Sequence, residues 1–108
     1  MDKTDSETLK IITRFMREAK KSLDVKRVIL FGSRASGQSS TWSDIDIAVI
    51  SNDFNGMDFI KRSARLGKIA WVAKTTEVEA FGFTEQEYER AGRLDFAWEI
   101  KKTGKVVA

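Results

Sequence analysis

The stretch VILFGSRASGQSSTWSDIDIAVI, residues 28–50, decides how this 108-residue chain folds. Two short apolar segments rich in β-branched residues, KRVILF at 26–31 and DIDIAVI at 44–50, predict a pair of strands. Between them, GSRASGQSSTWS contains two Gly and five Ser, which predicts a loop with a short helix beginning near Ser33. The stretch therefore predicts a buried strand, a polar connection and a second strand.

The flanking segments predict two long helices and a third strand. Residues 4–22 and 57–73 carry apolar side chains at spacings of three and four, which is the pattern of a helix with one buried face. Residues 75–83 alternate between acidic and apolar side chains, which is typical of a strand. These elements alternate along the chain and favour a layered arrangement of helices on a sheet.

The C-terminal quarter predicts two further helices and a short closing strand. Thr84 is followed three residues later by Glu87, the spacing of a capping box at the start of a helix. Residues 94–102 predict the last helix, which Gly104 ends. The order of elements is α-β-(α)-β-α-β-α-α. It predicts one domain over residues 1–108 of the α/β (α+β) class, with a small mixed β-sheet and helices mainly on one face.

The expected core consists of the apolar positions on the helix faces. They are Leu9, Ile12, Phe15, Met16 and Ala19 in the first helix; Phe59, Ile60, Leu66, Ile69, Ala70, Trp71 and Val72 or Ala73 in the second; and Leu94, Ala97 and Trp98 in the last. The cluster Lys61, Arg62, Arg65 and Lys68 predicts a solvated face, with an acidic partner as the functional alternative.

Composition excludes several kinds of chemistry. The chain has neither Cys nor His, which excludes disulfides, Ser-His-Asp triads and the usual zinc sites. No apolar run is long enough to cross a membrane and the N-terminal residues are polar, so we expect a cytoplasmic protein. The net charge is +3, but no recognition helix or aromatic-basic strand pattern accompanies it, so a nucleic-acid partner is not expected.

Carboxylates are the candidate metal ligands. A period of two residues puts Asp44 and Asp46 on the same face of their strand, where they repel each other unless a cation lies between them. A third acid, Glu79 or Glu77, lies on a strand that could pair alongside. Three carboxylates without His suit hard cations, above all Mg²⁺, which is commonly shared with substrate phosphates.

The turn after the first strand is the candidate phosphate site. Gly32 allows the backbone to approach a ligand closely, and the amides of a helix starting at Ser33 favour an anion. The Ser33 hydroxyl and the Arg34 guanidinium add hydrogen-bond donors. One loop thus offers hydrogen-bond donors for a phosphate while the next strand offers metal ligands. Enzymes that catalyse phosphoryl or nucleotidyl transfer need both.

The spacing of these residues resembles a known signature. Gly32-Ser33, ten residues and then Asp44-Ile45-Asp46 is similar to the G-S-x10-D-x-D motif of the DNA polymerase β-like nucleotidyltransferase superfamily. The sequence around this motif resembles that of the minimal nucleotidyltransferases, and the resemblance covers nearly the whole chain. It implies that Gly32 and Ser33 contact the triphosphate and that Asp44 and Asp46 bind two Mg²⁺ ions. The third acid, placed at Glu79 by the TEQEYE helix that follows, would bind only the catalytic ion; Glu77 is the competitor.

The resemblance also implies an activity and a partner. Minimal nucleotidyltransferases resemble the antitoxin half of two-protein modules whose other half is an all-helical HEPN protein. We therefore expect transfer of AMP from ATP to a partner Tyr or Ser hydroxyl, with a small molecule such as an aminoglycoside as second choice. The family usually has Asp as the third acid, and this chain offers only Glu. The alternative is thus a catalytically weak binding module that sequesters its partner.

Overall fold

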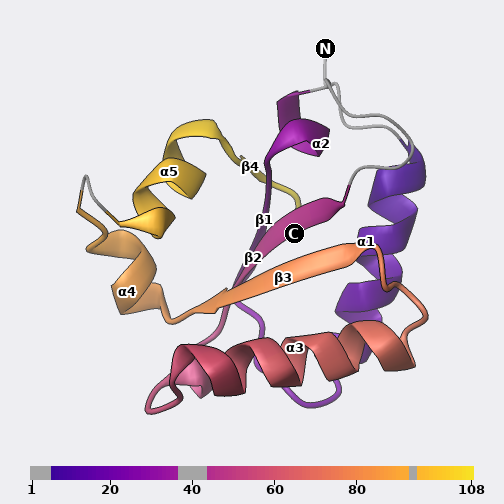
Figure 1. Ribbon diagram of the computed structural model, residues 1–108, viewed down its shortest axis with the longest axis horizontal. Helices are drawn as coiled ribbons and strands as arrows, with labels where there is room; N and C mark the ends of the chain where they lie inside the picture. The colour runs from indigo at the N-terminus through magenta and orange to yellow at the C-terminus, as the bar shows by residue number, and fades with distance from the viewer. Residues whose placement is uncertain (1–5, 37–43, 93–94) are drawn as a thin grey trace.

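A computed structural model describes residues 6–36, 44–92 and 95–108 and shows a four-stranded sheet (Figure 1). The strands are β1 Arg27–Phe31, β2 Ile45–Ile50, β3 Val78–Phe83 and β4 Lys105–Val106, in the order β3-β2-β1-β4. β1 runs antiparallel to both β2 and β4, whereas β3 runs parallel to β2. The mixed sheet is the one that the sequence predicts, with β3 at one edge.

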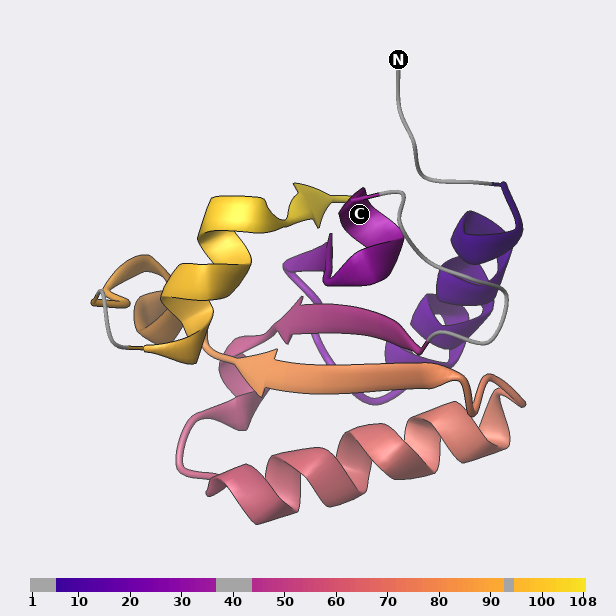
Figure 2. The same ribbon diagram turned by 45° about the horizontal axis from the view of Figure 1, so that its top comes forward.

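Helices cover both faces of this sheet. They are α1 Ser6–Ala19, α2 Ser33–Ser36, α3 Phe59–Val72, α4 Glu85–Glu89 and α5 Phe96–Thr103, with a 3-10 turn η1 at Asn52–Phe54. The two long helices, α1 and α3, pack on one face, as predicted, and the short helices α4 and α5 pack on the other (Figure 2). Among the described residues, no helix is long and apolar enough to span a membrane.

The strands divide their side chains between two cores. Ile45, Ile47 and Val49 of β2 contribute to the core under α1 and α3. Ala48 and Ile50, on the opposite face, contribute to the core under α4 and α5. The period of two residues predicted for this strand is therefore confirmed, and it assigns Asp46 to the α4–α5 face.

Hydrogen bonds at the start of α4 confirm the predicted capping box at Thr84. The Thr84 hydroxyl accepts from the Glu87 amide at 3.1 Å while the Glu87 carboxylate accepts from the Thr84 amide at 2.8 Å. Glu87 also pairs with Arg62 of α3, whose side chain is only 12% exposed. Arg62 in turn donates to the carbonyls of Met57, Phe54 and Gly82. This guanidinium joins α3, η1, β3 and α4.

Several residues expected in the core lie at the surface instead. Ile12, Phe15, Met16, Ala19, Leu66, Ile69, Ala70 and Ala97 are buried as predicted. The prediction is wrong for Leu9, Phe59, Ile60, Trp71 and Val72, which are all exposed. For the four residues of α3, the reason is that this helix rests on β3 and on α1 along one narrow face, so no other described helix or strand covers its remaining apolar side chains. Leu94 lies outside the described residues, and Trp98 is half-buried.

Candidate active site

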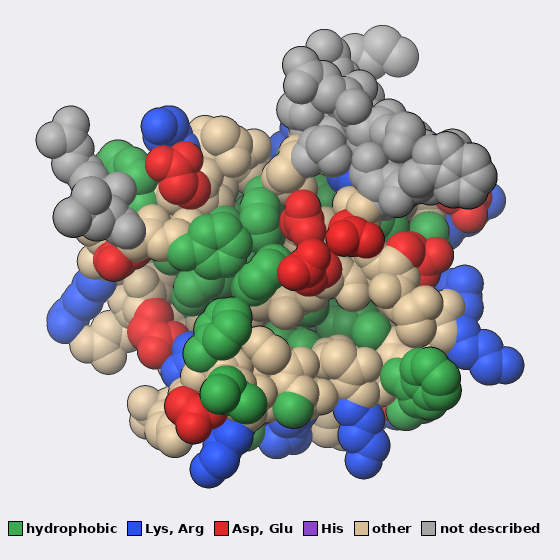
Figure 3. Space-filling view, viewed as in Figure 1, with side chains coloured by type: hydrophobic (Ala, Val, Ile, Leu, Met, Phe, Trp, Pro, Cys, Tyr) green, Lys and Arg blue, Asp and Glu red, His purple; other side chains and the backbone are tan. Residues whose placement is uncertain are grey.

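The predicted carboxylates meet where β2 and β3 run side by side. Asp44 immediately precedes β2, and Asp46 is its second residue. The parallel register makes Glu79 of β3 the direct partner of Asp46. Glu77 lies before β3 begins, and its carbonyl accepts a hydrogen bond from the Ile45 amide at 2.9 Å. The register thus favours Glu79 over Glu77 as the neighbour of the Asp pair, and Figure 3 shows acidic side chains gathered over this part of the sheet.

The acids repel one another in this arrangement. The pKa of Asp46 is raised above its ordinary value, chiefly because burial penalises the ionised carboxylate and then because Glu79 and Asp44 lie close to it. None of the ion pairs among the described residues involves these three acids. A half-buried carboxylate that lies close to two others attracts a cation. A hard divalent ion would neutralise the repulsion among the three acids.

The acids do not form a closed metal cage by themselves. Within residues 6–36, 44–92 and 95–108, no three acidic side chains are already arranged to enclose an ion. Mg²⁺ commonly takes only one or two carboxylates and completes its shell with water and substrate phosphate. The donor set of Asp44, Asp46 and Glu79, all carboxylates and two of them exposed, fits such a partly open site.

Gly32 lies directly against the Asp46 carboxylate. Its φ of +74° is in the left-handed region, and a Cβ built on it would lie 2.5 Å from Asp46 Oδ2. The contact follows from the β1–β2 register, which pairs Phe31 with Asp46. No other residue type could occupy position 32 without displacing this oxygen. The turn with its candidate phosphate amides is therefore built onto the candidate metal ligand.

The residues that follow Gly32 form the predicted short helix. α2 begins at Ser33, as expected, although the Ser33 side chain and residues 37–43 lie outside what the structure describes. Arg34 is half-buried, and its Nη1 donates to the Thr8 hydroxyl of α1 at 3.0 Å. This part of the Arg34 guanidinium ties α2 to α1, so the predicted role of Arg34 at a nucleotide remains a prediction.

An aromatic cluster beside the acids was not singled out from the sequence. The rings of Phe31, Phe81 and Phe96 lie 5.0–5.8 Å apart, and Phe96 is 47% exposed. Phe81 lies two residues after Glu79, so the period of two along β3 places them on the same face of the sheet. That alternation was available in the sequence, but the contribution of Phe96 from α5 depends on tertiary packing. The cluster gives the acid-bearing face an apolar neighbour.

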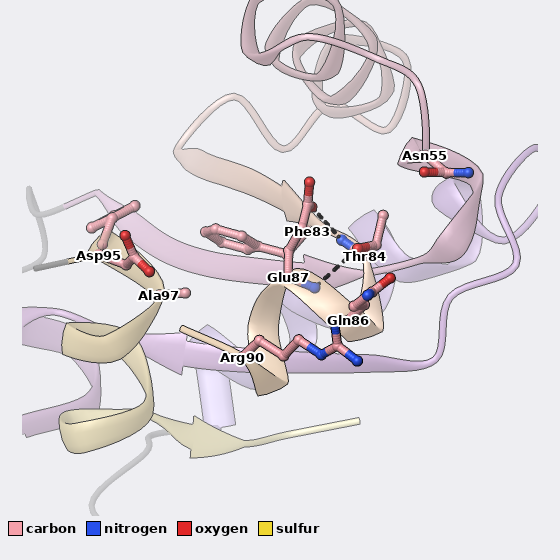
Figure 4. A pocket seen from close by; sticks show the side chains of 9 residues that line it. Asn55, Phe83, Thr84, Gln86, Glu87, Arg90, Asp95 and Ala97 are labelled. Carbon is pink, nitrogen blue, oxygen red and sulfur yellow. Dashed lines mark hydrogen bonds between the residues drawn. The ribbon is translucent and has the colours of Figure 1, made fainter. Parts of the chain in front are cut away.

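A separate cavity of about 640 Å³ lies at the other end of β3 (Figure 4). Thr84, Glu87 and Arg90 line it from the β3–α4 side, and Asp95 and Phe96 line it at the start of α5. It contains none of the three candidate metal ligands. Thr84 and Glu87 are engaged in the capping hydrogen bonds of α4. The cavity is thus a gap between short helices, and the acid cluster is the better candidate for chemistry.

Comparisons with known proteins bear on the family and the fold of the chain. Residues 10–108 match the family described as Polymerase beta, Nucleotidyltransferase. A crystal structure from Sulfolobus solfataricus assigned as a nucleotidyltransferase has a TM-score of 0.66 at 23% identity, covering 93% of this chain and 78% of that one. A chain of a toxin–antitoxin complex with AMP-PNP has a TM-score of 0.61 at 23% identity, covering 87% and 69%.

A weaker likeness and one negative result complete the comparisons. BolA1 from Arabidopsis thaliana has a TM-score of 0.55 at 15% identity, covering 71% of this chain and 94% of that one. No curated protein matched the chain in sequence. At these identities the structural neighbours show a shared fold and nothing about activity.

Proposed function

The chain belongs to the polymerase β nucleotidyltransferase family, and on that premise we propose that it transfers a nucleoside monophosphate, AMP from ATP, to a hydroxyl group with the help of Mg²⁺. One observation carries the proposal: the half-buried Asp46 carboxylate lies between Asp44 and Glu79 and directly against the Gly32 turn. A phosphate-binding turn and a cation-attracting acid cluster are needed together in such a reaction, and the contact between Gly32 and Asp46 supports assigning these two roles here.

The residues divide the work by position. Asp44 and Asp46 would hold two Mg²⁺ ions and Glu79 one of them; the ions supply charge stabilisation at the attacking and leaving oxygens. The backbone amides at Gly32 and Ser33 would bind the triphosphate. Glu79, exposed at the sheet edge, would orient the acceptor hydroxyl and take its proton. The new bond joins the hydroxyl oxygen to the α-phosphorus, and pyrophosphate leaves.

The acceptor is proposed to be a hydroxyl on a partner protein. We propose that the chain is a minimal nucleotidyltransferase and acts as an antitoxin whose HEPN-type helical partner carries the modified Tyr or Ser. The toxin–antitoxin neighbour bound to AMP-PNP supports this choice through its fold.

Label transfer tests the proposal. The wild-type chain, its co-expressed partner, Mg²⁺ and ATP labelled at the α-phosphate should give a labelled partner, while Asp44→Asn and Asp46→Asn should give none. Glu77→Gln is the matched control, since it neutralises a neighbouring acid that lies outside the β3 register. Circular dichroism establishes that each variant is folded. Undiminished transfer by either Asp variant would show that the acid pair is not catalytic.

One feature favours the second candidate, a binding module that sequesters its partner without turnover. The third acid is Glu where the family usually has Asp. This candidate expects the combined variant Asp44→Asn, Asp46→Asn and Glu79→Gln to bind the partner as the wild type does. It also expects no transfer by the wild type with Mg²⁺ and ATP. Transfer by the wild type excludes it.

A further inference from the structure

The outward face of α3 carries an apolar stripe that the fold leaves uncovered. Ile60, Ala64, Gly67 and Trp71, here called the α3 stripe, are spaced four, three and four residues apart and so lie along one line of the helix. All four are exposed. Ile60 is 76% exposed and Trp71 75%. Single apolar residues on a surface are ordinary, but a line of them at helical spacing indicates a contact face.

The shape of the α3 stripe suits another helix. The two large side chains lie at its ends, about 16 Å apart at 1.5 Å per residue. Ala64 and Gly67 lie between them, and a Cβ built on Gly67 would meet nothing within 4 Å. Small residues flanked by large ones let a second backbone approach closely at the centre, while the large residues pack against its sides. Figure 3 shows hydrophobic side chains at both ends of α3.

The charged residues within α3 are of one sign only, whereas its N-cap, Asp58, is acidic and exposed. The sequence of α3 contains two Lys and two Arg but no acid. Arg62 pairs with Glu87, and Arg65 donates to the Ser22 carbonyl at 3.0 Å. Lys61 and Lys68 are exposed, seven residues apart on one margin of the stripe, and neither takes part in an ion pair within the described part of the chain. Figure 3 shows Lys and Arg side chains along the lower margin of α3.

We propose that the α3 stripe docks an amphipathic helix of a partner protein, with acidic side chains next to its apolar seam. The apolar seam would cover Ile60 and Trp71, and the acids would face Lys61 and Lys68. Charge complementarity decides between this occupant and a second copy of the chain. Antiparallel packing of two α3 helices would place the Lys margins against each other, and no acid of α3 could compensate them in any orientation.

This docking surface is separate from the candidate active site. α3 packs on the face of the sheet opposite to Asp46, whose side of β2 belongs to the α4–α5 face. The proposal therefore goes beyond nucleotidyl transfer and does not depend on it. Asp46→Asn should bind the partner helix as the wild type does, so failure of one proposal leaves the other intact.

Two synthetic peptides provide the test. Both carry the same leucine seam at heptad spacing over three turns or more; one has Glu and the other has Lys at the positions beside the seam. The acidic peptide should bind the full chain and shift the Trp fluorescence to shorter wavelength, whereas the basic peptide should not bind. Trp71→Ser and Ile60→Ser should each weaken binding of the acidic peptide by about tenfold or more in Kd. The double variant Lys61→Gln and Lys68→Gln should weaken its binding by about three- to tenfold in Kd at low salt.

Controls keep these outcomes decisive. Trp71 and Ile60 are exposed, so their Ser variants should unfold at the wild-type temperature. Trp98→Phe, which changes a Trp outside the stripe, should leave binding unchanged. Equal binding of both peptides, no binding of the acidic peptide, or binding that ignores Trp71 would overturn the proposal. Sedimentation showing a dimer that Trp71→Ser dissociates would overturn it in favour of a second copy.

Discussion

Gly32→Ala tests whether the turn proposed to bind phosphate and the carboxylate proposed to bind metal, Asp46, are in direct contact. The substitution has two costs. Alanine at a φ of +74° is in the left-handed region, which costs about 1–2 kcal/mol. Its Cβ would also lie 2.5 Å from Asp46 Oδ2, whereas real Cβ atoms essentially never approach another heavy atom closer than 3.0 Å. The carboxylate must therefore move by at least half an ångström, which adds about 1 kcal/mol in a half-buried site.

A double-mutant cycle separates the two costs. Asp46→Ala removes the obstructing oxygen but keeps the Asp46 Cβ, which would lie 3.5 Å from the new Cβ in ordinary contact. Gly32→Ala should then cost only the backbone part, about 1–2 kcal/mol, against about 2–3 kcal/mol in the wild type. Urea unfolding of the four proteins measures the difference. Label transfer by Gly32→Ala should fall by about 10- to 100-fold, because a carboxylate displaced by up to 1 Å is misplaced for catalysis.

The cycle has a clear contrary result. If Gly32→Ala costs the same with and without the Asp46 carboxylate, the two residues do not touch, and the coupling between the turn and the acid cluster is wrong. Full label-transfer activity of Gly32→Ala would also argue against this contact. Asp46→Asn is a useful companion, since it keeps the obstruction while removing the charge.

Three further perturbations address the site and its support. Glu79→Gln should abolish label transfer while Glu79→Asp, which restores the usual acid of the family, should keep it within about tenfold of wild type; equal activity of all three would remove Glu79 from the site. In EDTA, Asp46→Asn should raise the Tm at neutral pH but not near pH 3. Because the pKa of Asp46 is raised in the folded protein, ionising this carboxyl costs stability as the pH rises above 3.8. An unchanged Tm at neutral pH would argue against crowding of the three acids. Glu87→Gln should lower the unfolding free energy by about 1–2 kcal/mol at pH 7. The difference from wild type should vanish as the pH falls through and below 4.5, because the hydrogen bond from Arg62 lowers the pKa of Glu87 in the folded protein. A loss that does not depend on pH would contradict the ion pair.

The strands and the acid pair could be predicted because their signals are local. Alternation along β2 assigns every residue to one of two faces, so Asp46 falls opposite to Ile45 and Ile47 before any partner strand is known. The capping box at Thr84 is equally local, since both of its hydrogen bonds join residues three apart. Such features depend on neighbours in sequence, and the structure confirms them.

The outer residues of α3 could not be assigned in the same way. Helical periodicity shows that a face is apolar but not what covers it. Ile60 and Trp71 have the same hydrophobicity signal as Leu66 and Ile69, yet only the second pair meets the sheet. The exposure of the first pair depends on α3 lying at the β3 edge, which is a fact of topology. The error in predicting the core is thus the observation from which the docking surface follows.

The position of Glu79 bears on how a Glu can replace the usual Asp of the family. Adjacent strands lie about 4.8 Å apart, so the direct register leaves Asp46 and Glu79 side by side, with little room for a longer side chain to extend straight toward its partner. Glu79, however, is exposed on an edge strand, where it can fold back or lean outward at a cost in rotamer entropy of about 1 kcal/mol. That cost is small beside the stabilisation that a shared divalent ion would provide to three mutually repelling carboxylates. A Glu at the sheet edge is therefore compatible with catalysis, whereas the same substitution at the half-buried Asp46, pressed against Gly32, would not be.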